Sequence, residues 1–177
     1  SLLTSTGTSC IWTTPPNPTA GFASWSSLLY NSDHDKNIPF EERALIFDGS
    51  TQTKANYVPK TAEVRLLFTI PFAMTINGFR FYHGDDSCST RNLFVSMNDK
   101  VEVVENFGCG WATFNRFTVE NIIAGQTIEL GSLSQGYGFS IRAIEINGQV
   151  LTDGQAFNQM QAFALEHSLR SGLLKLP

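Results

Sequence analysis

Oxygen-bearing side chains gather in one short turn, Phe47-Asp48-Gly49-Ser50-Thr51-Gln52-Thr53. Asp48 offers a carboxylate, Ser50 and Thr53 offer hydroxyl oxygens, and calcium takes six to eight oxygen ligands of this kind. Glu145 completes the set if the closing segment, Ile141–Gly148, lies beside the turn. The sequence therefore predicts a structural calcium site made by Asp48, Ser50, Thr53 and Glu145. The alternative is an Asx turn in which Asp48 binds its own backbone.

A second set of residues suits the recognition of a sugar. An aromatic ring can lie against the C–H groups of a sugar, while Arg, Asp, Asn or His binds its hydroxyls. Such residues occur in three segments expected to be loops at one end of a β-sandwich, where binding sites are common. The candidate ligand-binding residues are His83, Asp85, Asp86, Arg91, Trp111 and Tyr137. The alternatives are core packing for Trp111 and simple solvation for the charged residues.

Three cysteines occur in the chain, Cys10, Cys88 and Cys109. Cys88 and Cys109 lie in polar segments that follow strand-like runs, and in a sandwich such loops can meet at one end. One interpretation is a Cys88–Cys109 disulfide, and the other is three unpaired thiols. A zinc site is disfavoured, because there is no C-x-x-C and His83 is the only histidine near either loop cysteine.

Short β-branched and aromatic segments, separated by Gly, Asn and Asp, recur from residue 44 onward. Their spacing is typical of a β-sandwich or jelly roll. The predicted strands are Ala62–Pro71, Thr75–His83, Asn92–Met97, Lys100–Asn106, Trp111–Val119, Gln126–Gly131 and Gly138–Asn147. The fold class predicted is all-β, an antiparallel β-sandwich of about eight strands.

Extensions flank this predicted sandwich, which spans residues 44–152 and leaves an arm at 1–43 and a tail at 153–177. The prolines at 15, 16 and 18 cannot join a central sheet. Phe22–Tyr30 carries enough apolar residues to pack on the sandwich or on a neighbouring subunit. Gln155–Leu169 has the spacing of an amphipathic helix, which ends at Ser171-Gly172. This helix either lies across a sheet edge or docks another subunit.

Composition excludes some classes of partner. The chain has 177 residues, of which 42% are hydrophobic and 16% are charged, so a single domain with one core is expected. A net charge of -4 with no dense Lys/Arg cluster argues against nucleic acid. No apolar run approaches the roughly 18–20 residues that span a bilayer, so membrane insertion is not expected.

Catalytic motifs are absent from the sequence. There is no G-x-S-x-G nucleophile turn, and no glycine pattern for phosphate or dinucleotide binding. His34, His83 and His167 lie in three different contexts and form no ligand spacing. The chain is therefore predicted not to be an enzyme.

Two segments together resemble a known family. Phe47-Asp48-Gly49-Ser50-x-x-Thr53 and the closing Ile144–Gly148 are similar to the galactose-binding-like jelly rolls of the discoidin or coagulation-factor C type, over residues 44–150. The resemblance implies a structural calcium ion at the opening turn and a carbohydrate-binding or adhesion role. It extends to domains of phage tail and other virion surface proteins. The family's usual calcium carboxylate falls nearer position 143, which is Ala143 here. Glu145 shares its side of the strand, so either Glu145 substitutes for it or the calcium is absent.

The sequence and the resemblance together predict a non-catalytic carbohydrate-binding or adhesion module. Its partner would be a glycan or cell-surface receptor, and it would belong to a virion or cell-surface assembly such as a phage tail fibre or receptor-binding protein. Its location would be the virion surface or the extracellular space. The arm and the tail helix would hold other subunits in an oligomer. One alternative is a structural virion or assembly subunit that uses the sandwich for protein contacts, and another is an accessory domain of a larger carbohydrate-active enzyme.

Overall fold

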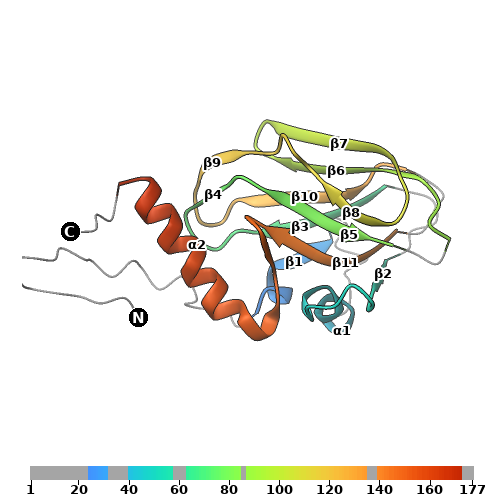
Figure 1. Cartoon of the computed structure of the whole chain (residues 1–177), viewed down its shortest axis with the longest axis horizontal. Coiled ribbons are helices and arrows are strands. Elements are labelled where there is room, and N and C mark those ends of the chain that lie inside the picture. Colours follow the sequence, from blue (N-terminus) through green and yellow to red (C-terminus); the bar gives the residue numbers. More distant parts are fainter. Residues whose placement is uncertain (1–23, 32–39, 58–62, 85–86, 135–138, 173–177) are drawn as a thin grey trace, which may run out of the picture.

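Two antiparallel β-sheets pack face to face in this chain (Figure 1). The computed structural model describes residues 24–31, 40–57, 63–84, 87–134 and 139–172. Every strand pairing among these residues is antiparallel. The prediction of an all-β, antiparallel sandwich with a C-terminal helix is confirmed.

The first sheet has five strands in the order β1-β3-β10-β6-β7. Their bounds are β1 Leu29–Asn31, β3 Val64–Thr69, β10 Thr127–Ser132, β6 Arg91–Met97 and β7 Lys100–Phe107. Strand β3 alternates between buried and half-buried residues, as expected for a strand with one face on the core. Strand β7 lies at the edge and is mostly exposed.

The second sheet has the order β12-β11-β5-β8, and β2 also pairs with β11. Their bounds are β12 Gln149–Val150, β11 Phe139–Ile146, β5 Phe79–His83, β8 Gly110–Thr113 and β2 Ala55–Tyr57. A small separate sheet joins β4 Met74–Ile76 to β9 Val119–Ile122. Figure 1 shows β5, β8 and β11 running across β3, β6 and β10.

The described residues contain more strands than the eight or so predicted, because two predicted strands are each divided. The predicted strand Thr75–His83 is divided into β4 and β5, because Asn147 binds the backbone at the break. The Asn147 backbone N–H donates to the Gly78 carbonyl (2.8 Å), and Asn147 Oδ1 accepts a hydrogen bond from the Asn77 N–H (2.9 Å). Trp111–Val119 becomes β8 and β9, with a turn closed by the Phe117 N–H on the Phe114 carbonyl (3.2 Å). The remaining additions are strands of two or three residues.

Helices occupy both flanks of the sandwich. The short elements are η1 Ser26–Leu28, α1 Phe40–Ala44, η3 Leu45–Phe47 and η4 Asp153–Gln155, and the long one is α2 Ala156–Arg170. The predicted helical tail is confirmed, and Gly172 follows it with φ of +74°, the left-handed conformation expected at a helix end. The helical turns at 40–47 were not predicted. Within the described ranges, no helix is long and apolar enough to cross a membrane.

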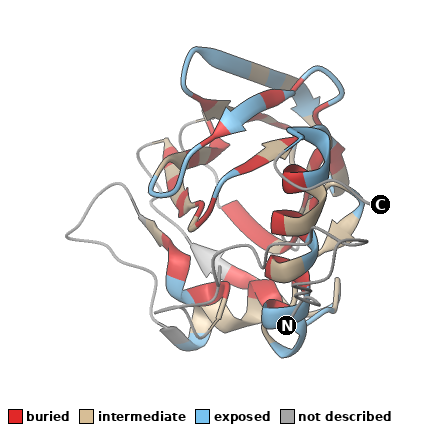
Figure 2. Cartoon of the chain, turned by 90° about the vertical axis from the view of Figure 1, so that its left-hand side faces the viewer, coloured by how far each residue is buried: buried red, intermediate tan, exposed pale blue. Residues whose placement is uncertain are grey.

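A cluster of phenylalanines fills the interior between the sheets. Phe81 lies at its centre, with ring centroids 5.4 Å from Phe114 and 6.2 Å from Phe139. Phe79 packs on Phe117 at 5.8 Å. Each buried aromatic side chain removes about 150–250 Å² from water, which makes this cluster a main source of stability. In Figure 2 the buried residues line the inside of the sandwich.

Trp25 ties the start of the described chain to its end. Its buried ring lies 6.0 Å from Phe68 of β3 and 6.1 Å from Phe163 of α2, measured between ring centroids. Its indole N–H donates to Gln159 Oε1 (2.9 Å). Together with the pairing of β1 on β3, this shows that the described part of the 1–43 segment packs on its own sandwich. Residues 1–23 and 32–39 of that segment lie outside the described residues.

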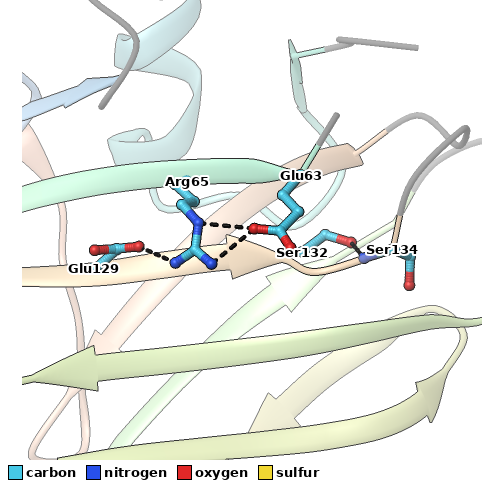
Figure 3. A network of polar contacts seen from close by, with 5 residues as sticks. All are labelled: Glu63, Arg65, Glu129, Ser132 and Ser134. Carbon is cyan, nitrogen blue, oxygen red and sulfur yellow. Dashed lines mark hydrogen bonds and ion pairs between the residues drawn. The ribbon is translucent and has the colours of Figure 1, made fainter. Parts of the chain in front are cut away.

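An ion-pair network lies over the outer face of the first sheet (Figure 3). Arg65 pairs with Glu63 (2.7 Å) and with Glu129. Its guanidinium also lies 5.0 Å from the centre of the Phe94 ring. The hydrogen bond that Arg65 donates to the Glu129 carboxylate raises the pKa of Arg65 above its ordinary value. The stability gained from that shift is present below the ordinary pKa and is lost only as the pH rises through the raised value, so it stays constant around neutral pH.

Candidate functional site on the outer face of the second sheet

Aromatic and charged side chains gather on the outer face of the second sheet. Strand β5 buries Phe79, Phe81 and His83 on its inner face, so alternation turns the residues between them outward. The neighbouring strands add side chains to the same face. We call this group the outer platform, and its members are Arg80, Tyr82, Trp111, Arg142 and Glu145.

Trp111 is the centre of the outer platform. The Arg80 guanidinium carbon lies 4.2 Å from the centre of the indole ring, within cation–π distance. The Tyr82 ring meets the indole edge-on, with ring centroids 5.4 Å apart and planes at 84°. Of the two tryptophans in the described residues, Trp25 is buried, whereas Trp111 remains partly exposed. An indole ring is thus held rigidly at the surface.

An ion pair holds Arg80 in its place over the indole. Arg80 and Glu145 are directly opposite each other on β5 and β11, and Nη2 of Arg80 lies 2.5 Å from Oε2 of Glu145. The Glu145 side chain is largely buried, while that of Arg80 is more exposed. A charge-assisted bond to a largely buried carboxylate limits the rotamers of Arg80. The platform is therefore ordered before any ligand arrives.

Arg142 connects the outer platform to the opening turn. An irregularity in the pairing of β11 occurs at this residue. Arg142 Nε donates to the Gly84 carbonyl (3.1 Å) and Nη1 donates to the Thr51 carbonyl (2.9 Å). Its guanidinium carbon is 5.9 Å from the centre of the Tyr82 ring. The opening turn and the closing strand are therefore neighbours in space, as the sequence predicted.

His83 lies in the interior of the sandwich. It is fully buried at the end of β5, and its Nδ1 is 2.9 Å from the Ser140 carbonyl oxygen. Its ring stacks on Phe139, with centroids 5.3 Å apart and planes at 11°. A ligand at the surface does not reach this ring, so the expectation of a direct contact is corrected. His83 instead helps to join β5 to β11 beneath the outer platform.

Arg91 is also buried, with only 2% of its surface exposed, and it donates to the Ser89 carbonyl. Its role is to order the loop before β6, and direct contact with a ligand is again corrected. Trp111 is the predicted ligand-binding residue that the structure places at the surface. Three predicted ligand-binding residues, Asp85, Asp86 and Tyr137, lie outside the described residues.

A disulfide joins Cys88 to Cys109, with Cα atoms 5.2 Å apart. It links the loop before β6 to the turn between β7 and β8, two residues before Trp111. Both cysteines are exposed. The bridge therefore fixes the start of β8 and with it the backbone that carries the indole. Cys10 lies outside the described residues.

The opening turn has the geometry of an Asx turn. Asp48 Oδ1 accepts a hydrogen bond from the Ser50 N–H (2.9 Å), and Oδ2 accepts one from the Thr53 hydroxyl. The Thr53 Oγ1 also lies 3.5 Å from the Leu45 carbonyl oxygen. The oxygens of Asp48, Thr53 and Leu45 thus converge. They are fewer than the six to eight oxygen ligands that calcium takes.

Glu145 does not join this turn, since its carboxylate is paired with Arg80 on the outer platform. The Ser50 hydroxyl accepts a hydrogen bond from the Gln52 N–H (3.0 Å). Among the described residues there is no group of three or more His, Cys, Asp or Glu side chains that could hold a metal. The residues present therefore do not fit the four-residue calcium site expected from the sequence. Calcium binding stays a prediction that rests on Asp48 and Thr53.

Sequence reasoning missed three members of the outer platform, Arg80, Tyr82 and Arg142. The period-2 alternation of Phe79–His83 carries the signal for the first two, since residues 80 and 82 must share the face opposite Phe81. No alternation in the sequence indicates that Arg142 faces outward, because the irregularity in the pairing of β11 determines the face on which its side chain lies.

Comparisons with known proteins give a structural likeness only. No protein-family model matches the chain, and no curated protein gives a significant match. Among solved structures, the chain is similar to chitosan-binding module 1 from the chitosanase/glucanase of Paenibacillus sp. IK-5, with a TM-score of 0.48 and 16% identity over 71% of this chain and 98% of that one. It is similar to CpGH89CBM32-6 of Clostridium perfringens, with a TM-score of 0.41 and 13% identity over 75% and 99%.

A third similar structure is a Ruminococcus gnavus GH29 fucosidase in complex with fucose. Its TM-score is 0.43 and its identity is 11%, over 77% of this chain and 29% of that one. Identities of 11% to 16% and TM-scores no higher than 0.48 carry neither a ligand nor an activity over to this chain. The function of this chain is therefore inferred from the residues of the outer platform.

Proposed function

We propose that this chain is a non-catalytic carbohydrate-binding domain and that the outer platform is its binding site. The observation that carries the proposal is the partly exposed indole of Trp111, which Arg80 and Tyr82 hold on the outer face of the second sheet. A rigid aromatic surface packs well on the C–H face of a pyranose ring. The ordered side chains around it lower the entropy cost of binding.

Polar groups of the outer platform suit sugar hydroxyls. Arg80 and Arg142 supply N–H donors, and Glu145 supplies carboxylate acceptors, so both donor and acceptor sides of a hydroxyl can be met. None of these groups is arranged with a nucleophile or a base partner, and the function proposed involves binding without bond cleavage.

We place the domain on a virion or cell surface, in an assembly such as a phage tail fibre or receptor-binding protein. The Cys88–Cys109 disulfide supports this location, because such bridges persist outside the reducing cytosol.

The test is a glycan array screened with the folded chain, with added calcium and again with a chelator. We expect a limited set of cell-surface glycans to bind. If calcium occupies the Asp48 turn, its addition raises the melting temperature of the same samples, and Asp48→Asn removes that rise while keeping the Asx turn. An array with no bound glycan under either condition would contradict the proposed function, and an unchanged melting temperature would end the calcium prediction.

A second candidate function is a structural subunit of a virion or other assembly, which uses the sandwich for protein contacts. The exposed apolar side chains of α2 favour it, since Phe157 is 53% exposed and Leu169 is 38% exposed. Figure 2 shows exposed residues on this helix beside buried ones. Sedimentation of the wild type and of a Phe157→Ser, Leu169→Ser double variant measures the oligomeric state of each and tests this candidate. We expect an oligomer that the double variant dissociates, and a wild type that stays monomeric at high concentration would remove this candidate.

A further inference from the structure

A groove runs between the edge strands β7 and β8, beside the outer platform. Its volume is about 630 Å³, which is within the usual range of ligand sites. Six of the residues that line it are Val101, Glu102, Val103, Thr113, Asn115 and Arg116. The two strands belong to different sheets, so the groove lies at the open edge of the sandwich.

The groove is continuous with the outer platform through Thr113. Thr113 and Trp111 are two residues apart on β8, so their side chains lie on the same face of the strand, about 7 Å apart along it. Thr113 is also directly opposite Arg80 in the sheet. A ligand that covers the indole and continues along β8 therefore passes over Thr113 into the groove.

The side chains of the groove have the mixed chemistry that a sugar chain needs. Val104 lines the groove on the same face of β7 as Glu102 and is half-buried, and its methyl groups suit the C–H faces of sugar rings. Thr113 and Asn115 are exposed and offer a hydroxyl and an amide to sugar hydroxyls.

Charge along the groove argues for a neutral ligand. Glu102 and Arg116 contribute one negative and one positive charge, and the Glu102 carboxylate already accepts a hydrogen bond from the backbone N–H of Arg116 (3.0 Å). An ionisable side chain on the groove side of an edge strand also disfavours the addition of another protein strand. The groove is thus better suited to a sugar chain than to a peptide.

We propose that this groove is an extension subsite of the outer platform, so that the ligand is a neutral oligosaccharide of several units and not a single sugar. The inference rests on the proposed function. It specifies that the ligand has several sugar units and carries no charge. It also identifies residues that determine which ligand length binds.

The experiment measures affinity by calorimetry for a neutral oligosaccharide series, from the single sugar upward, built on the glycan that the array selects. We expect the wild type to gain about tenfold or more in affinity from the monosaccharide to the longer members. Thr113→Val with Asn115→Ala should lose most of this gain and leave the monosaccharide affinity unchanged. The matched control is Asn158→Ala, which removes an exposed asparagine from α2 and should behave as the wild type.

Three results would overturn the inference, and they are distinguishable. Affinity that does not depend on length in the wild type would show that the groove is no subsite, while binding of the monosaccharide would still support the outer platform. Absence of binding by every member would overturn the proposed function together with the subsite. Length dependence that survives in the double variant would also overturn the assignment of the groove. The wild-type series alone can overturn the inference, so the inference remains testable even if the double variant does not fold.

Discussion

Replacing Gly131 with alanine is expected to destabilise the sandwich by about 4 kcal/mol or more, a large fraction of the 5–15 kcal/mol typical of a domain. Gly131 lies in β10, paired with β3, and has φ of +153°. A Cβ atom at this position would lie 1.9 Å from the Val64 carbonyl oxygen and 2.9 Å from its carbonyl carbon. Backbone atoms of a paired strand cannot move aside as a side chain can, so the ladder between β10 and β3 must separate locally.

Urea denaturation of a glycine-to-alanine series measures this effect. Gly154→Ala is the matched control, because no atom lies within 4 Å of its added Cβ and its φ is not positive, so a change within about 0.5 kcal/mol is expected. Gly125→Ala also has open space but has φ of +94°, so it should show only the backbone strain, about 1–2 kcal/mol. Equal losses for Gly131→Ala and Gly125→Ala would contradict the predicted steric clash.

Replacing Trp111 with alanine is expected to reduce glycan affinity by about thirtyfold or more, which corresponds to the roughly 2 kcal/mol of a binding hot spot. The substitution removes the stacking surface and also leaves Arg80 without the ring that it covers. The fold should survive, because Trp111 is partly exposed and lies outside the buried core. Calorimetry with the best glycan from the array, together with a melting curve, measures both quantities.

Two further variants make this result specific. Tyr30→Ala removes a partly exposed aromatic residue from β1 of the other sheet, and it should bind as the wild type does. Trp111→Phe keeps a smaller aromatic surface and should bind with intermediate affinity. Wild-type affinity in Trp111→Ala would show that the sugar binds elsewhere on the chain.

The strands with long, regular alternation were predictable from the sequence. The hairpin of β6 and β7 followed from its Met97-Asn98-Asp99-Lys100 turn, where Asn98 has φ of +56°. Strand β11 and helix α2 followed from their apolar spacing. Strand β1 was not predicted, because a run of three residues has too little pattern, and only its pairing with β3 defines it.

The candidate site was less predictable, because the partners of its residues come from distant strands. His83 ends the predicted strand Thr75–His83 and precedes a glycine, so it was expected to face a loop, yet Phe139 and Ser140 bury it. Glu145 had the right chemistry for calcium, but Arg80 on the neighbouring strand takes its carboxylate. Register between strands decides such pairings, and a single sequence does not specify register across segments so far apart.

The contact between Trp25 and α2 has a consequence for how the molecule folds. The bond from Trp25 to Gln159 spans 134 residues, and the one from Ser26 to Asp153 spans 127. Contacts of such high sequence separation make folding slow, because closing a long loop costs entropy before the contact stabilises the chain. During synthesis Trp25 completes its packing only after the segment up to Phe163 has emerged. A nascent chain that ends before residue 159 lacks both Gln159 and Phe163, so it leaves part of that indole exposed to solvent, where apolar surface promotes aggregation.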